Sequence, residues 1–140
     1  MKKPIPKSVI GLDIGIKRIG LAGCDPLGIT VSRLKCIKRG NFEDDLEIFK
    51  DLCNLRNPLA LIVGLPLDMK ERETKQSNIT RKYAKKLSEA LDLPVIYINE
   101  HSSSIEARER LNLYNDRSGK IDSESAAILV EQWLNEGPDI

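Results

Sequence analysis

One stretch near the start of the chain, residues 9–15 with the sequence VIGLDIG, constrains the fold more than any other. Its β-branched and apolar residues predict a buried strand, and its glycines allow neighbouring backbone to come close. Asp13 is the exception, because a carboxylate among buried apolar side chains must be hydrogen-bonded, paired or bound to a cation. A metal site is one solution. The alternative is that Asp13 only ends the strand and organises the turn at Gly15.

Size and composition limit the class of protein. A chain of 140 residues, 31% charged and 41% apolar, suits one soluble domain spanning residues 1–140. No stretch approaches the roughly 20 apolar residues of a membrane span, so no membrane partner is expected. Lys2 and Lys3 are followed by Pro4 and Pro6 instead of the apolar core of a signal peptide, which predicts a cytoplasmic protein. Three cysteines without CxxC spacing argue against a disulfide framework or a zinc site.

The charge pattern points to local cation clusters. A formal net charge of +1 excludes a uniformly basic surface, so a polyanionic partner must be held by such clusters. Lys17 and Arg18 directly follow the first strand, and a predicted helix carries Arg81, Lys82 and Lys85 on its exposed side. The alternative is that each cluster is only a solvated face.

The first half of the chain reads as strands followed by a helix. Residues 9–15, 18–24 and 29–37 predict three strands, and their short connections favour an antiparallel meander. Asn41 then precedes apolar residues at helical spacing from Phe42 to Cys53, which predicts an N-capped amphipathic helix. Residues 59–64 form an unbroken apolar run, which is typical of a central parallel strand.

The second half alternates helices with one more strand. Residues 68–77 are charged and polar and predict a mobile loop at a strand's carboxyl end, where open α/β sheets bind ligands. An apolar stripe from Ile79 to Leu91 predicts a helix, residues 95–98 predict the last strand, and further helices are expected from residue 103 and from near residue 122. We therefore expect an α/β fold with a mixed five-stranded sheet, three antiparallel strands followed by parallel strands, flanked by about four helices.

Three acidic residues fall at the edges of these elements: Asp13 in the first strand, Glu100 after the last strand and Asp122 near the start of the final helix. If the sheet gathers them, their mutual repulsion requires a divalent cation, and all-oxygen ligation favours Mg²⁺ or Mn²⁺ over zinc. Two such ions would suit phosphodiester cleavage. The alternatives are that Glu100 is a solvated surface acid and that Asp122 is only a helix N-cap.

His101 and the serines that follow it are weaker candidates. His101 lies beside Glu100 and suggests a general base, but a single exposed histidine more often has no catalytic role. The serines at positions 102 to 104 have no neighbouring base except that histidine, so a serine nucleophile is not expected. Ser104 is better suited to donating its hydroxyl to a phosphate.

The segments GLDIGIKRIGLA (residues 11–22), VGLPL (63–67), NEH with SIEA (99–107) and DS before Ala126 together resemble the YqgF/RuvX family of Holliday junction resolvase-like proteins. The resemblance covers nearly the whole chain. It implies an RNase H-like fold, metal-dependent nuclease activity, a cytoplasmic location and maturation of the 5′ end of 16S rRNA. By the family's pattern Asp13, Glu100 and Asp122 form the acidic catalytic triad, with Lys17 and Arg18 near the substrate phosphates.

The chain departs from the family's pattern beside Glu100. The family usually has Asp-Glu-Arg followed by Thr, where this chain has Asn99, Glu100, His101 and, three residues later, Ser104. The loss of the arginine removes a permanent bidentate phosphate ligand, and His101 replaces it only when protonated.

We therefore predict a nuclease that acts on structured RNA, with the carboxylates holding the metal and with cationic and polar side chains holding the phosphates: Lys17, Arg18, Arg81, Lys82, Lys85, His101 and Ser104. Two alternatives stay open. One is a resolvase-like nuclease acting on branched DNA, which requires a dimer, whereas the sequence indicates a monomer or a weak homodimer. The other is a non-catalytic nucleic-acid-binding module in transcription or ribosome assembly.

Overall fold

A computed structural model of the chain describes residues 8–99 and 120–138. In chain order its elements are β1 (Ile10–Ile14), β2 (Arg18–Cys24), β3 (Val31–Lys38), α1 (Phe42–Arg56), β4 (Leu61–Leu65), α2 (Lys75–Leu91), β5 (Val95–Asn99) and α4 (Lys120–Glu136). The five strands form one sheet with the spatial order β3-β2-β1-β4-β5. Strand β2 runs antiparallel to both β1 and β3, whereas β1, β4 and β5 run parallel. The predicted mixed sheet is confirmed.

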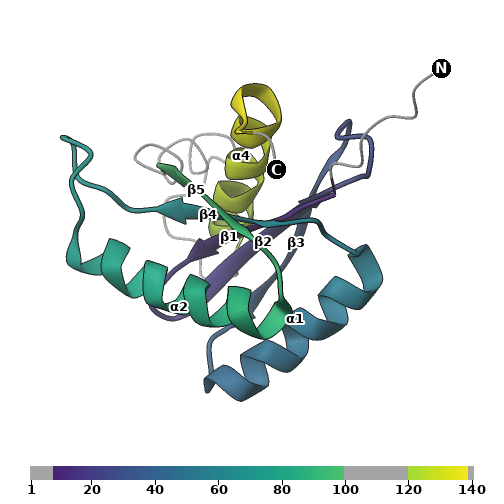
Figure 1. Ribbon diagram of the computed structural model, residues 1–140, viewed down its shortest axis with the longest axis horizontal. Helices are drawn as coiled ribbons and strands as arrows, with labels where there is room; N and C mark the ends of the chain where they lie inside the picture. Colours follow the sequence, from purple (N-terminus) through teal and green to yellow (C-terminus); the bar gives the residue numbers. More distant parts are fainter. Residues whose placement is uncertain (1–7, 100–119, 139–140) are drawn as a thin grey trace.

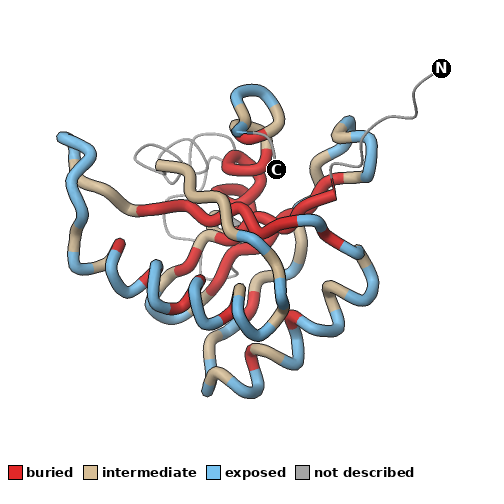
Figure 2. Tube along the Cα trace, viewed as in Figure 1, coloured by how far each residue is buried: buried red, intermediate tan, exposed pale blue. Residues whose placement is uncertain are grey.

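The helices divide between the two faces of this sheet, as Figure 1 shows: α1 and α2 cover one face and α4 covers the other. Strand alternation sends Ile10, Leu12 and Ile14 into the core beneath α1 and α2. A second core joins the opposite face to α4, with Ile62 and Trp133 among its members. The buried residues accordingly follow the strands and the inner sides of the helices (Figure 2).

The three helices of the described residues agree with the predictions except at the starts of α2 and α4, where α4 begins at Lys120 and not near Asp122. Asn41 caps α1 by accepting a hydrogen bond from the Asp44 amide, as predicted. Helix α2 begins at Lys75, whereas the sequence placed residues 75–77 in a loop. Thr74 and Ser77 form a reciprocal capping box that starts the helix early.

The loop before α2 is held by its own side chains. The Asp68 carboxylate accepts hydrogen bonds from the amides of Lys70 and Arg72. The Arg72 guanidinium also donates to that carboxylate over 2.9 Å. These hydrogen bonds, the Arg72 amide first, lower the pKa of Asp68.

The sequence predicted about four helices, and the described residues form three. The additional helix expected from residue 103 lies outside the described residues. None of the described helices is long and apolar enough to cross a membrane.

A buried polar contact joins the two helices on the first face. The Tyr83 hydroxyl of α2 donates a 3.0 Å hydrogen bond to the Asp45 carboxylate of α1, and both residues are buried. Asp45 also accepts the amide of Gly40, and the ring of Phe42 meets the Tyr83 ring edge-on at 5.7 Å between centroids. Burial, and then the hydrogen bond to Asp45, raise the pKa of Tyr83 above its ordinary value. The contact ties α1 to α2 where apolar packing alone would leave their relative position less specific.

We expect Tyr83→Phe to lower the free energy of unfolding by about 1.5–3 kcal/mol at neutral pH, because Asp45 loses a donor to a buried charge. The raised pKa means that the folded state holds the phenolic proton more tightly than the unfolded chain. This stabilisation is complete below about pH 10 and declines as the pH rises above it. Urea unfolding at neutral and alkaline pH measures both effects, and the variant should lose less stability at high pH than the wild type. Tyr97→Phe, which keeps the ring beneath Arg81, is the control for the effect at neutral pH.

Candidate functional site

Asp13 lies inside β1 rather than at its end, because the strand continues to Ile14. It is half-buried, and strand alternation places it on the same face as Gly11, the face that α4 covers. The turn that follows is closed by backbone, since the Gly15 amide donates to the Arg18 carbonyl over 2.8 Å. The carboxylate therefore sits on the α4 face of the sheet at the carboxyl end of its central strand.

The backbone of Asp122 lies close to β2, near Asp13. Gly20 of β2 stands opposite Asp13 in the antiparallel register. A Cβ atom added to Gly20 would overlap the carbonyl group of Asp122, so the first turn of α4 rests directly on Gly20. Residues paired across antiparallel strands have Cα atoms about 5 Å apart and side chains on the same face. The structure thus brings Asp13 and Asp122 together, although they are far apart in the sequence.

Asp122 is not the N-cap of α4, because the helix begins at Lys120 and Asp122 lies within its first turn. The alternative that Asp122 serves only as a helix cap therefore does not hold.

Two contacts of the following residues fix the start of α4 against β3. The Ser123 hydroxyl donates a 2.7 Å hydrogen bond to the Leu34 carbonyl. Glu124, only 2% exposed, forms a two-pronged ion pair with the Arg33 guanidinium, in which Nη2 lies 2.7 Å from Oε1 and Nε donates to Oε2. Neither Arg33 nor Glu124 was predicted to have a role. The available signal was an acidic residue two positions before the apolar run that starts at Ala126.

The third predicted acid, Glu100, lies outside the described residues, as do His101 and Ser104. The structure describes the chain as far as Asn99, the last residue of β5, which pairs with Leu65. Because β1, β4 and β5 are parallel, their carboxyl ends meet at one edge of the sheet. Strand β5 therefore ends at the edge where Asp13 lies, with only β4 between them.

The described residues partly meet the requirements of a Mg²⁺ or Mn²⁺ site. Asp13 and Asp122 offer the oxygen ligands that such ions prefer, and Gly20 leaves room for the approach of α4. Within residues 8–99 and 120–138 no group of three His, Cys, Asp or Glu side chains is close enough to hold a metal. That range does not include Glu100, the third predicted ligand.

The basic residues after β1 lie at the same edge of the sheet. Lys17 is exposed and Arg18 is half-buried. Arg39 braces their turn, because its guanidinium donates to the Gly15 carbonyl over 2.8 Å and its amide donates to the Lys17 carbonyl over 2.9 Å. The backbone of the turn that carries Lys17 is therefore held in place.

The predicted basic cluster of α2 is not on the Asp13 face, because α2 covers the opposite face of the sheet (Figure 1). Arg81 is ion-paired with Glu73 and lies 4.8 Å from the centroid of the Tyr97 ring. The hydrogen bond from Arg81 to Glu73 raises the pKa of Arg81. Lys82 and Lys85 are exposed.

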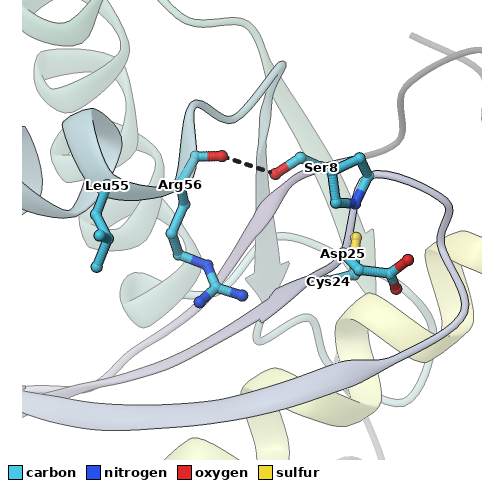
Figure 3. Close-up of a pocket in the computed structure, with 6 residues that line it drawn as sticks. Ser8, Cys24, Asp25, Leu55 and Arg56 are labelled. Atoms are coloured by element: carbon cyan, nitrogen blue, oxygen red, sulfur yellow. Dashed lines mark hydrogen bonds between the residues drawn. The ribbon is translucent and has the colours of Figure 1, made fainter.

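A pocket of about 260 Å³ lies at the other edge of the sheet, near the start of β1 and the end of β2. Figure 3 shows the Ser8 hydroxyl bonded to the Arg56 carbonyl and the Asp25 carboxylate pointing away from Arg56. That carboxylate accepts the amides of Thr30, Ile29 and Leu27, which lower the pKa of Asp25. The Arg56 guanidinium packs where a Cβ of Gly23 would lie. This pocket is separate from the pair of carboxylates.

Comparison with solved structures defines the class of protein. The fold matches RuvC of T. thermophilus in complex with a Holliday junction substrate, with a TM-score of 0.55, 14% identity and coverage of 94% of this chain and 96% of that chain. It also matches the yeast mitochondrial Holliday junction resolvase Ydc2, with a TM-score of 0.55, 13% identity and coverage of 96% and 80%. The chain therefore has the RNase H-like fold of the RuvC-type resolvases.

Sequence comparison gives the family. The family model described as "RuvX: Holliday junction resolvase" matches residues 7–136. A protein of Parasynechococcus marenigrum named "Putative pre-16S rRNA nuclease" is 53% identical over 137 residues, which are 98% of this chain and 87% of that protein. A protein of the same name from Prochlorococcus marinus (strain MIT 9313) is 54% identical over 138 residues, 99% of this chain and 86% of its own length. The chain belongs to the RuvX family of nucleases, as its motifs predicted.

We expect Gly20→Ala to lower the free energy of unfolding by about 3 kcal/mol, because the new Cβ overlaps the backbone of Asp122, which cannot rotate away. The denaturant midpoint measures this effect. Gly40→Ala is the matched control, because a Cβ there meets nothing within 4 Å. Equal midpoints for the two variants would contradict the close approach of α4 to β2.

Proposed function

We propose that the chain is a metal-dependent endonuclease that processes the 5′ end of precursor 16S rRNA in the cytoplasm. The observation that carries this proposal is the placement of Asp13 and Asp122 on one face of an RNase H-like sheet, at the edge where β5 ends before Glu100. The proposal for the substrate rests on relatives about 50% identical over nearly the whole chain, which are named for pre-16S rRNA.

In this proposal Asp13, Glu100 and Asp122 are the catalytic residues and hold Mg²⁺ or Mn²⁺. When bound, a divalent ion in such a site activates a water for in-line attack on phosphorus and stabilises the leaving oxygen. The ion pair of Glu124 with Arg33 holds the backbone of Asp122 in place. This keeps the start of α4 beside β2, so the position of the Asp122 backbone does not depend on a bound ion.

We assign the contacts with the substrate's phosphates to the cationic side chains around this edge of the sheet. Lys17 is exposed in the turn after β1 and Arg18 follows it, so both lie where phosphates flanking the cleaved bond would pass. Lys82 and Lys85 on α2 offer a second, more distant contact, and Arg81 contributes less because Glu73 neutralises it. His101 and Ser104 are proposed as further phosphate contacts on the ground of sequence alone.

Asp13→Asn is expected to lower the rate of metal-dependent cleavage at least about 100-fold, because an amide removes both the negative charge and a metal ligand. RNA binding should survive, since phosphate contacts do not need Asp13. Cleavage of a 5′-extended 16S rRNA fragment in Mn²⁺, compared with chelator, measures the first effect, and fluorescence anisotropy measures the second.

Asp51→Asn, which changes an exposed carboxylate on α1, is the matched control for the lost charge. Unchanged cleavage by Asp13→Asn would remove Asp13 from the site. Equal loss in both variants would show that the effect does not arise at the site.

A second substrate, four-way junction DNA, is favoured by the description of the family model and by the fold shared with RuvC. Junction resolution needs two sites in a dimer, so it predicts preferential cleavage of the junction together with a dimer in solution. The same assay with junction DNA in place of the rRNA fragment, combined with sedimentation of the free protein, separates the two substrates.

Titration with Mg²⁺ tests catalysis against simple binding. We expect the backbone amide signals of residues 11–15 and of Asp122 to shift together in a spectrum of the free protein, because one ion would touch both elements. A non-catalytic binding module has no reason to perturb these two segments jointly. Absence of a joint shift, together with absence of cleavage, would favour such a module.

A further inference from the structure

A groove of about 510 Å³ lies between the turn after β1 and the first turns of α2. Ile16 of that turn and Ile79 of α2 both line it, and Arg39, Lys75 and Gln76 complete the lining. In Figure 1 the turn after β1 lies close to the amino-terminal half of α2, in agreement with this shared lining. Neither Asp13 nor Asp122 lines the groove.

The walls of the groove are apolar and open to solvent. Ile16 is 78% exposed and Ile79 is 40% exposed. Single exposed aliphatic residues are common, but two that line one groove offer an apolar surface for a ligand. Such a surface suits the ring of a nucleobase.

The remaining lining is cationic. Among the described residues, the lining contains Arg39 and Lys75 and no carboxylate. Arg39 is fixed in place, because its guanidinium donates to the Gly15 carbonyl and lies 4.7 Å from the centroid of the Tyr83 ring. Lys75 is exposed and is the first residue of α2, so its positive charge adds to that of the helix N-terminus. The groove therefore favours a ligand that has an anionic group beside an apolar ring. A nucleotide has both, because it carries a phosphate and a base.

The groove continues from the candidate active site around one turn. Asp13 lies on the face covered by α4, the groove lies on the face covered by α2, and residues 15–17 connect them at the sheet edge. Lys17 is exposed on that turn. A single strand that leaves the Asp13 side can thus cross the edge over a cation before it reaches the groove, whereas paired bases are stacked and cannot enter it.

We propose that this groove binds one unpaired nucleotide of the RNA substrate, next to the cleaved phosphodiester. Its base lies between Ile16 and Ile79, and its phosphate lies against Lys75. The inference rests on the proposed function and adds to it a specificity for substrates with a single-stranded flank. Ile16 and Ile79 are specificity residues here and take no part in the chemistry.

The test measures binding by fluorescence anisotropy in chelator, so that cleavage does not contribute. Two RNA probes are used, one blunt duplex and the same duplex with a single-stranded extension. We expect Ile16→Ser and Ile79→Ser each to weaken binding of the extended probe about fivefold and to leave binding of the blunt duplex unchanged. Ile29→Ser is the matched control, because Ile29 is 76% exposed in the turn between β2 and β3, at the opposite edge of the sheet.

Lys75→Ala supplies an independent measurement. For the extended probe, the slope of log K against log salt concentration should become smaller in magnitude by about 0.7, the value for one phosphate contact on a single strand. Removing a positive charge from the first residue of a helix does not destabilise it, so the variant should fold normally.

The proposal is overturned if the wild type binds both probes equally, if Ile29→Ser weakens binding as much as Ile16→Ser, or if the isoleucine variants weaken both probes alike. Failure of the proposed function looks different. In that case the wild type cleaves no RNA in Mn²⁺, while the preference for the extended probe and its loss in Ile16→Ser remain. If the wild type cleaves RNA but shows no preference for the extended probe, the groove proposal is wrong and the proposed function stands.

Discussion

The candidate site depends on the contact between the backbone of Asp122 and the bare Cα of Gly20. Any side chain larger than hydrogen at this position of β2 would push α4 away from the sheet. Because Gly20 is paired with Asp13, the contact that seats the helix also brings the backbone of Asp122 close to Asp13. Packing thus holds the backbone of Asp122 in position, and the ion pair of Glu124 with Arg33 reinforces it.

The two faces of the sheet have different roles. The face covered by α4 carries the carboxylates, and the face covered by α1 and α2 carries most of the large apolar core together with the buried contact between Asp45 and Tyr83. Arg39 connects the two, because its guanidinium lies on the Tyr83 ring and also holds the Gly15 carbonyl. A rigid second face thus supports the turn that carries Lys17. The proposed nucleotide groove uses this same support at the sheet edge.

Much of the fold could be predicted, because local signals and the tertiary structure agree in most elements. The alternation in β2 and the cap at Asn41 each specify an element without help from distant residues. The start of α2 was missed because Thr74 and Ser77 form a capping box with serine in place of the usual Glu or Gln, within a run of charged residues that resembles a loop. Asp13, Glu100 and Asp122 were predicted from residue type and spacing with the support of a family resemblance, whereas the ion pair of Glu124 with Arg33 was overlooked.

The order of amino acids was enough to establish the order and kind of the elements, the mixed sheet and the family, because hydrophobic period, caps and motif spacing are local properties of the chain. Packing in three dimensions was needed to establish which face Asp13 and Asp122 share, that Glu124 is buried against Arg33, and that α2 lies on the side away from the carboxylates. The difference arises because a buried charge is tolerated only where a partner from elsewhere in the chain meets it. No local pattern specifies a partner 91 residues away.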